Sequence, residues 1–501
     1  MSYIFGDGFD CYAASADTLS GYWDAGTMSG VSLVVGRFAG GQALRIAVVS
    51  TLNILIKSST ANEAVHHVSV ALRQETSLSG ATLCTALQFV DASTVQCSIV
   101  FRSDGTILLT SGTFSGSTLA TYAGAVGALN TWVQFEFEVV INNTTGSFKV
   151  RKNGNTVDDH STTGINTRGG TANNYANKLV LLNNQTNLNP QQFDDLLWRS
   201  DATSLAWLGD IRCFTRMPAS DASVQFTRAP NNYLTWASAT VSSTTATTAN
   251  RVSATAVTAP VSGVLASLIV NLQSAATGNV RMAVYDATGA SGSPGNLIAN
   301  TTSSAIVNPA AGVNTFVVTG GAALTKSTVY WVAIHGDVIV SILSPASGTS
   351  SWFLNQTYAS GFPATMSGAT QTGTGGWGSL GMNITPNNAS LVNETLQDGT
   401  TSYVYDSTPG HADLYNIAAL SPSPVTVHAV TTRGFVAKSD AGTRSGAMQI
   451  KSGATTVASP TLALSSSFLW AWRTDTLNPN GSVAWTPTAV DAVQVGPSVV
   501  S

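Results

Sequence analysis

The chain has 501 residues and a formal net charge of −4, and only 10% of its residues are charged, against about 25% in typical soluble domains. Because 44% of the residues are hydrophobic, the composition excludes a disordered chain and favours many short strands joined by Gly, Asn and Ser turns. The lack of a Lys/Arg cluster argues against nucleic-acid binding, and the sequence has no run of about 18 apolar residues that could insert into a membrane.

The front part of the chain alternates apolar and polar side chains with a period of two, as half-buried strands do. The clearest case is residues 131–141, TWVQFEFEVVI, in which one face carries Val133, Phe135, Phe137 and Val139. The opposite face carries Trp132, Gln134, Glu136 and Glu138. The next strand, residues 147–154, ends at Asn-Gly, a strong tight-turn signal. Many short strands at regular spacing predict a sandwich or jelly roll.

The spacing of the four cysteines fits no zinc site. A hairpin turn over residues 91–94 would pair Val90 with Val95 and place Cys84 opposite Phe101, not opposite Cys97. We therefore expect free, buried thiols in a chain that folds in a reducing cytoplasm. The first ten residues have neither the basic nor the apolar region of a signal peptide, which fits the same expectation.

Several segments of residues 1–226 resemble a known family. The opening FGDGFDCY, then GRFAGGQALRI (36–46), FDDLLWRS (193–200) and WLGDIR (207–212) are similar to the concanavalin/laminin-G-like jelly roll at the front of many tailed-bacteriophage virion proteins. Residues 388–501, with NETLQDGTTSYVYD and VTVHAVTTRGFVAKSDAGTR, resemble the module that follows that jelly roll. Asn478 departs from this pattern, which usually has Asp before the proline.

Residues 228–387 are predicted to be a separate domain inserted at the junction, because the sequence abruptly becomes Ser/Thr/Ala-rich and almost free of charge. Its strands are readable, and Val280, Met282 and Val284 share one face. The segment resembles a jelly-roll-type β-sandwich of bacterial and phage surface proteins, in which sugar binding is a frequent role. The expected fold class is therefore all-β and multi-domain, with jelly-roll or β-sandwich domains and little helix.

A glycan site is predicted in residues 350–381 of the inserted domain, because this Gly-rich stretch combines aromatic and amide side chains. The candidate residues are Trp352, Asn355, Tyr358, Phe362 and Trp377. The alternative is that Phe353 and Trp377 fill the core of the sandwich.

Calcium is the one cofactor that the jelly-roll resemblance implies, since laminin-G-like sandwiches often hold Ca²⁺ at a rim. Asp7 and Asp10 lie near the first strand, and Asp194 and Asp195 lie on the last strand of the jelly roll. If these strands are neighbours, the four carboxylates converge and supply part of the six to eight oxygens that Ca²⁺ needs. The alternative is that they are turn and edge-strand aspartates with local hydrogen bonds.

No catalytic constellation is evident, and we expect a protein that is not an enzyme. Glucanases on similar jelly rolls resemble one another in a Glu-x-Asp-x-x-Glu strand, and the nearest match here is Glu136 and Glu138, about 7 Å apart along a strand. The intervening Asp and the third carboxylate are missing. There is no Gly-x-Ser-x-Gly motif, and the adjacent His66 and His67 should point to opposite faces of their strand.

The sequence therefore predicts a structural component of a tailed-phage virion, of tail-fibre, tail-tip or head-fibre type, assembled in the bacterial cytoplasm. Its expected partners are other virion proteins, further copies of itself and a host-surface glycan. Two alternatives are a capsid decoration (cement) protein without receptor binding and a polysaccharide depolymerase. Phe468, Trp470 and Trp472 either form a subunit contact or fill the core of the C-terminal module.

Overall fold

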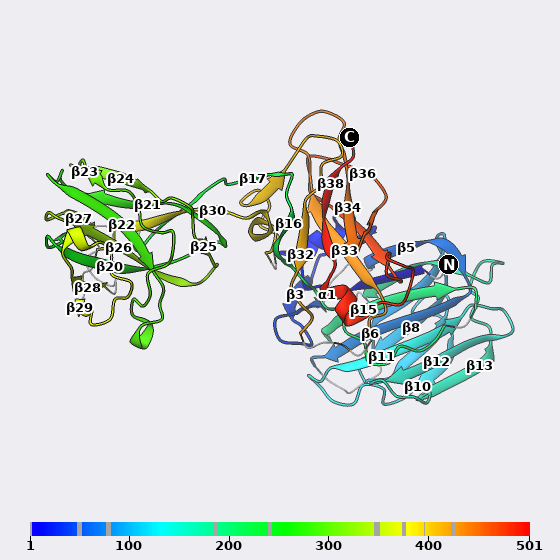
Figure 1. The fold of residues 1–501 in the computed structure, drawn as a ribbon. Coiled ribbons are helices and arrows are strands. Elements are labelled where there is room, and N and C mark those ends of the chain that lie inside the picture. The colour runs from blue at the N-terminus through cyan, green and yellow to red at the C-terminus, as the bar shows by residue number, and fades with distance from the viewer. Residues whose placement is uncertain are drawn as a thin grey trace. The chain divides into compact units, whose positions relative to one another are not determined.

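The computed structural model describes residues 3–47, 53–76, 82–183, 189–203, 205–238, 243–344, 351–372, 377–394, 396–421, 424 and 426–501. The chain is all-β, as predicted, and in the described part it has one short α-helix, α1 (Pro487–Asp491) (Figure 1). It forms two compact units. The first contains residues 1–217, 394–398 and 407–501, and the second contains residues 218–393 and 399–406.

The front of the first unit is a sandwich of two antiparallel sheets, which we call sheets 1 and 2. Sheet 1 has the order β13 (His160–Ile165), β12 (Gly146–Lys152), β11 (Val133–Val140), β6 (Val65–Gln74), β15 (Gln191–Asp201), β4 (Gln42–Ile46) and β3 (Val31–Val35), with β1 (Tyr3–Asp7) beside β15. Sheet 2 has the order β10 (Thr118–Tyr122), β9 (Ile107–Ser111), β8 (Thr94–Arg102), β7 (Leu83–Asp91), β14 (Ala176–Asn183), β5 (Asn53–Glu63) and β2 (Ala25–Gly26).

The core of this sandwich follows the predicted strand faces. The apolar face of β11 is buried in it, through Val133, Phe135, Phe137 and Val139. The predicted turn between β12 and β13 begins with Asn153 at φ 52° and Gly154 at φ 75°, the left-handed geometry that an Asn-Gly turn requires. The first and last strands are neighbours, since Asp7 on β1 pairs with Leu196 on β15.

The hairpin of β7 and β8 confirms one predicted register and corrects another. Val90 pairs with Val95 as expected, but Phe101 pairs with Thr85 and not with Cys84. The cause is a register shift between Phe89 and Val90, and a second shift follows between Leu83 and Thr85. All four cysteines are free, and all except Cys213 are buried.

The C-terminal module belongs to the same compact unit as this jelly roll. Its strands β32 (Leu414–Ile417), β38 (Gln494–Val499), β34 (Ser445–Ser452) and β35 (Thr455–Ala458) pair in that order, with β36 (Leu462–Ala463) also on β34. A separate ribbon pairs β33 (Val430–Val436) with β37 (Leu469–Asp475). The module has its own small core, which contains Ile450, Trp485, Val490 and Val493.

The aromatic residues of β37 join this module to the jelly roll within one chain. Trp470 is part of the jelly-roll core, and its indole nitrogen donates to the Asp17 carbonyl oxygen at 3.0 Å. Trp472 packs edge-on against Tyr22 and Phe5, with ring centroids 5.4 and 6.2 Å away. These two residues therefore pack against the jelly roll of the same chain and do not fill the module's own core.

The second unit is another β-sandwich, with sheets that we call 3 and 4. Sheet 3 has the order β18 (Tyr233–Trp236), β30 (Leu380–Pro386), β21 (Gly263–Leu272), β27 (Ser341–Ser344) and β19 (Ser243–Ala246), with β24 (Gly312–Val317) and β25 (Ala323–Leu324) also on β21. Sheet 4 has the order β23 (Ile306–Val307), β22 (Asn279–Tyr285), β26 (Val329–Gly336), β20 (Arg251–Thr258), β28 (Ser351–Asn355) and β29 (Thr370–Thr372).

The core between sheets 3 and 4 contains Val280, Met282 and Val284, as the alternation on β22 predicted. The same unit includes β16 (Pro218–Ser223) and a short ribbon of β17 (Thr227–Ala229) and β31 (Tyr403–Tyr405). The predicted insertion, residues 228–387, lies inside this unit. Most residues of the two predicted flanking domains, 1–226 and 388–501, belong to the first unit.

Candidate functional site

Glu136 lies on the outer face of β11, where it holds a neighbouring chain segment. Its carboxylate accepts hydrogen bonds from the backbone nitrogens of Leu208 at 2.8 Å and Gly209 at 3.0 Å. The Arg199 guanidinium lies 3.4 Å away, and the Glu136 side chain is only 3% exposed. Both oxygens of Glu136 are thus occupied in fastening residues 208–209 to sheet 1.

Glu138 contacts two basic side chains on the same face. It lies 2.8 Å from His67 Nε2 and 2.9 Å from Lys149 Nζ. Although burial alone would raise it, these hydrogen bonds lower the pKa of Glu138 to about 2. The indole of Trp207 covers His67 at a centroid distance of 5.0 Å, which shields the pair from solvent.

The two adjacent histidines point to opposite faces of β6, as predicted. His67 contacts Glu138 on the outer face. His66 is turned into the core, where its Nδ1 accepts from the Trp198 indole at 3.2 Å. Burial lowers the pKa of His66 to about 3, so this imidazole is neutral at physiological pH.

Asp7, the first of the four predicted calcium ligands, is buried under the aromatic residues of the first unit. Its carboxylate accepts from the Tyr12 hydroxyl at 2.6 Å, the Trp23 indole at 2.8 Å and the Phe9 backbone nitrogen at 2.9 Å. It also lies 3.6 Å from the Arg433 guanidinium. Asp7 therefore serves an internal network.

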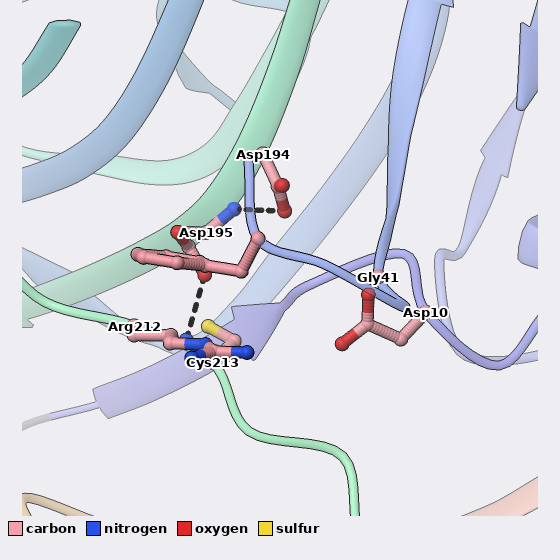
Figure 2. A pocket seen from close by; sticks show the side chains of 7 residues that line it. Asp10, Gly41, Asp194, Asp195, Arg212 and Cys213 are labelled. Carbon is pink, nitrogen blue, oxygen red and sulfur yellow. Dashed lines mark hydrogen bonds between the residues drawn. The ribbon is translucent and has the colours of Figure 1, made fainter. Parts of the chain in front are cut away.

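The other three aspartates, Asp10, Asp194 and Asp195, do converge. Figure 2 shows them around one small pocket, together with Gly41, Arg212 and Cys213. The pocket volume of about 10 Å³ corresponds to about one water molecule. Asp195 occupies a bulge of β15 with φ 49°, a left-handed conformation that turns its side chain relative to the regular strand.

Backbone donors already fill much of this carboxylate group. Asp194 accepts from the backbone nitrogens of Arg37 and Asp195, both at 2.7 Å. Asp195 in turn accepts from the Cys213 nitrogen at 2.7 Å, and Gln42 donates its nitrogen to Asp10 at 2.8 Å. Burial, added to the mutual repulsion of the two carboxylates, raises the pKa of Asp194, and burial likewise raises that of Asp195.

In this arrangement the aspartates do not fit a calcium ion. No group of three or more acidic, His or Cys side chains with metal-site geometry occurs among the described residues. The Arg37 guanidinium lies 3.5 Å from the second oxygen of Asp195, and Arg212 lines the same pocket. Arginine side chains therefore already supply positive charge beside these carboxylates. Ca²⁺ would need six to eight free oxygens here.

The five predicted glycan residues separate into two groups. Trp377 is 2% exposed and packs in the core between sheets 3 and 4, so it presents no face to a ligand. Asn355 is exposed and pairs with Arg251 across β28 and β20. Asn355 and Trp352 are three positions apart on β28, so their side chains point to opposite faces of sheet 4.

The remaining candidates, Trp352, Tyr358 and Phe362, are each partly exposed. Trp352 pairs with Ala254 on β20, and Phe362 packs against the same apolar cluster from the loop after β28. Tyr358 begins a short 3-10 turn, Tyr358–Ser360, in that loop. Of the five predicted side chains, the structure thus places Trp352 and Phe362 on one apolar cluster.

Two further residues, Arg281 and His335, complete this cluster and escaped the sequence prediction. They are cross-strand partners on β22 and β26. The Arg281 guanidinium lies 4.2 Å from the Tyr358 ring centroid, and the His335 ring is 5.2 Å from Tyr358 and 5.5 Å from Phe362. The missed signal was the alternation on both strands, which puts these residues on the face opposite the predicted core.

No family model matches the sequence, and no curated protein matches it either. A carbohydrate esterase from the Shiga toxin-encoding bacteriophage phi24B is 14% identical with a TM-score of 0.27, covering 35% of this chain and 88% of that one. A GH131 beta-glucanase catalytic domain from Podospora anserina is 15% identical with a TM-score of 0.25, covering 40% and 97%. The CBM2 module of the evolved Dit of Lactobacillus casei BL23 phage J-1 is 8% identical with a TM-score of 0.23, covering 41% and 92%.

Similarities at these identities and TM-scores assign no activity or ligand to this chain. Among the described residues, no helix has the length and apolar character needed to cross a membrane.

Proposed function

We propose that the chain is a non-enzymatic structural component of a tailed-phage virion and that its second unit contacts host-surface glycans. The observation that supports the glycan contact is the position of three partly exposed aromatic residues at the outer face of sheet 4. Trp352 and Phe362 pack on one apolar cluster, and Phe362 and Tyr358 both lie against the ring of His335. Aromatic rings offer a large apolar surface at low conformational cost, and sugar rings have apolar faces that can pack on them.

The state of the two candidate catalytic carboxylates supports a binding role over hydrolysis. A glycosidase needs one carboxyl group with a raised pKa as the acid and a second that faces the substrate. Glu138 instead has a pKa lowered to about 2, and Glu136 is occupied by two backbone nitrogens. Neither group is poised for proton transfer to a sugar.

The virion assignment draws on the resemblance of the jelly roll and C-terminal module to phage virion proteins and on the composition. A surface with few charges changes little with ionic strength, which suits a particle outside the cell. Several copies joined by a symmetric interface would turn a weak single glycan contact into stable attachment.

The glycan contact is tested with the full-length protein on an array of bacterial surface polysaccharides. Tyr358→Ala should weaken binding at least about tenfold, the equivalent of about 1.4 kcal/mol. Tyr405→Ala is the matched control, because Tyr405 is a 50% exposed tyrosine of the same unit on β31. Absence of binding by the wild-type protein to every polysaccharide would leave a decoration protein as the remaining function.

The virion assignment is tested on purified particles with gold-labelled antibodies raised against the chain. Labelled particles are expected, and particles that lack the chain would refute the assignment. Incubation of the protein with the bound polysaccharide should leave its chain length unchanged. Shortening that Glu136→Gln or Glu138→Gln abolishes would instead identify a depolymerase.

A further inference from the structure

The outer face of sheet 4 holds an arginine that no carboxylate of the described chain neutralises. Within the described residues, the Arg281 guanidinium makes one hydrogen bond, from Nη2 to the Tyr358 carbonyl oxygen, and its buried Nε has no partner. Its other contacts are the rings of Tyr358 at 4.2 Å and Phe362 at 5.6 Å. The side chain is partly exposed, so a ligand can reach it.

The nearby aspartates are used elsewhere. Asp337, directly after β26, accepts from the backbone and side-chain nitrogens of Asn279, both at 2.7 Å. Asp286, directly after β22, accepts from the Asn296 backbone nitrogen at 2.7 Å and from Thr288. Both carboxylates stabilise their own loops and leave Arg281 without a counter-ion.

The cross-strand neighbour of Arg281 supplies no negative charge either. His335 is fully buried, and burial lowers its pKa, so the ring is neutral at physiological pH. Its Nε2 contacts the Gln356 carbonyl oxygen at 2.8 Å, whereas Nδ1 has no hydrogen-bond partner. Because Nε2 faces a carbonyl oxygen, it carries the ring proton, and Nδ1 is an acceptor that does not bind an anion. The unpartnered donor of this cluster is therefore Arg281 Nε, and buried donors without partners are uncommon in folded proteins.

Three arginines of the first unit differ from Arg281 because each has a carboxylate partner. There Arg37, Arg199 and Arg433 each lie within 3.6 Å of a buried aspartate or glutamate. A guanidinium that is partly removed from water favours a carboxylate strongly, because its planar fork can donate two parallel hydrogen bonds. An anionic ligand group at Arg281 would supply the missing partner while an aromatic ring of the cluster packs on the sugar.

We propose that the glycan bound by the second unit is acidic and that Arg281 binds the carboxylate of a uronic or sialic acid residue. This inference rests on the proposed glycan contact of Trp352, Tyr358 and Phe362. It adds the chemical class of the ligand and a residue that determines specificity.

The test uses the full-length protein and pairs of oligosaccharides, such as oligogalacturonate, oligoglucuronate and a sialylated glycan, each with its carboxyl-reduced form. Calorimetry should show the acidic member of at least one pair binding at least about tenfold more tightly than its reduced form. Arg281→Met should abolish this preference, and Arg281→Lys should retain part of it, because the charge remains but the fork is lost.

Arg251→Met is the matched control. Arg251 is another partly exposed arginine of sheet 4, with its guanidinium 4.2 Å from the Phe353 ring centroid. It pairs with Gly336, the residue after His335, and therefore faces the other side of the sheet. This variant should keep the preference for the acidic member.

The outcomes separate the two proposals. Equal affinity of the wild-type protein for the acidic and reduced members would overturn the inference on Arg281 and leave the glycan contact intact. If Arg281→Met still prefers the acidic member, the inference on Arg281 is likewise overturned and the glycan contact is left intact. No binding of any glycan would overturn the contact itself. If Arg281→Met does not fold, Arg281→Lys is compared with the wild type at the same salt concentration. An undiminished preference in Arg281→Lys overturns the inference, and a reduced preference supports it.

Discussion

The guanidinium of Arg433 on β33 lies 3.6 Å from the carboxylate of Asp7 on β1, and this ion pair joins the C-terminal module to the jelly roll. The Asp7 side chain has no exposed surface, and that of Arg433 is 15% exposed. The ring centroids of Tyr22, Tyr12 and Trp470 lie 4.7, 5.2 and 5.2 Å from the guanidinium. A cation is thus held among aromatic faces against a buried anion.

Replacement of this arginine should destabilise the first unit specifically. Arg433→Met removes the partner of a buried carboxylate, and the expected loss is about 3–5 kcal/mol in the free energy of unfolding. Urea denaturation followed by tryptophan fluorescence measures it. In Arg444→Met, which breaks an exposed pair with Asp440, the loss should stay under about 1 kcal/mol. Equal losses in the two variants would show that the buried pair has no special weight.

Glu136→Gln should loosen the segment of residues 205–217 without removing an activity. The amide keeps the shape of the side chain but has one acceptor oxygen in place of two, so it cannot accept from both the Leu208 and Gly209 nitrogens as the carboxylate does. It also loses the negative charge that faces Arg199. The expected cost is about 1–3 kcal/mol. Limited proteolysis should cut this segment faster than in the wild type. Asp104→Asn, which alters a more exposed pair with Arg102, should leave the cleavage rate unchanged.

The buried pair Asp194 and Asp195 should make stability fall as the pH rises. The pKa of both groups is raised above the ordinary 3.8, so the folded state binds more protons than the unfolded state. Their contribution is therefore complete below about pH 4 and is lost as the pH rises through the higher folded-state values, by up to about 1.4 kcal/mol per pH unit for each proton.

The measurement is the difference in unfolding free energy between the wild type and Asp194→Asn from pH 4 to pH 8. The difference is needed because His66, whose pKa is lowered, contributes the opposite slope over part of this range. The wild type should lose stability relative to the variant as the pH rises. A constant difference would contradict the raised pKa of Asp194.

Trp377→Ala should unfold the second unit more readily. Because the indole is 2% exposed in the core between sheets 3 and 4, its truncation should cost about 3–5 kcal/mol. Trp352→Ala, at a partly exposed tryptophan of the same sandwich, should cost clearly less. Thermal unfolding followed by calorimetry distinguishes the two. A smaller loss for Trp377→Ala than for Trp352→Ala would contradict its place in the core.

Local patterns in the sequence predicted much of the fold. The alternation in residues 131–141 placed Phe135 and Phe137 in the core, and the same reasoning placed Met282 in the core of the second unit. The register of β7 and β8 was correct at Val90 next to the turn and wrong at Cys84. Each bulge shifts the pairing by a residue, and the apolar/polar alternation of a strand does not show where a bulge lies.

The sequence by itself determined the all-β class and the face to which many side chains point, because alternation along a strand depends only on neighbouring residues. The tertiary structure alone decided what the polar side chains do. Glu136 holds residues 208–209, Asp195 faces Arg37, and Arg281 meets Tyr358, because strand order and register bring together residues far apart in the chain. Such partners depend on how the strands pair in three dimensions, and the spacing of residues along the chain does not predict this pairing.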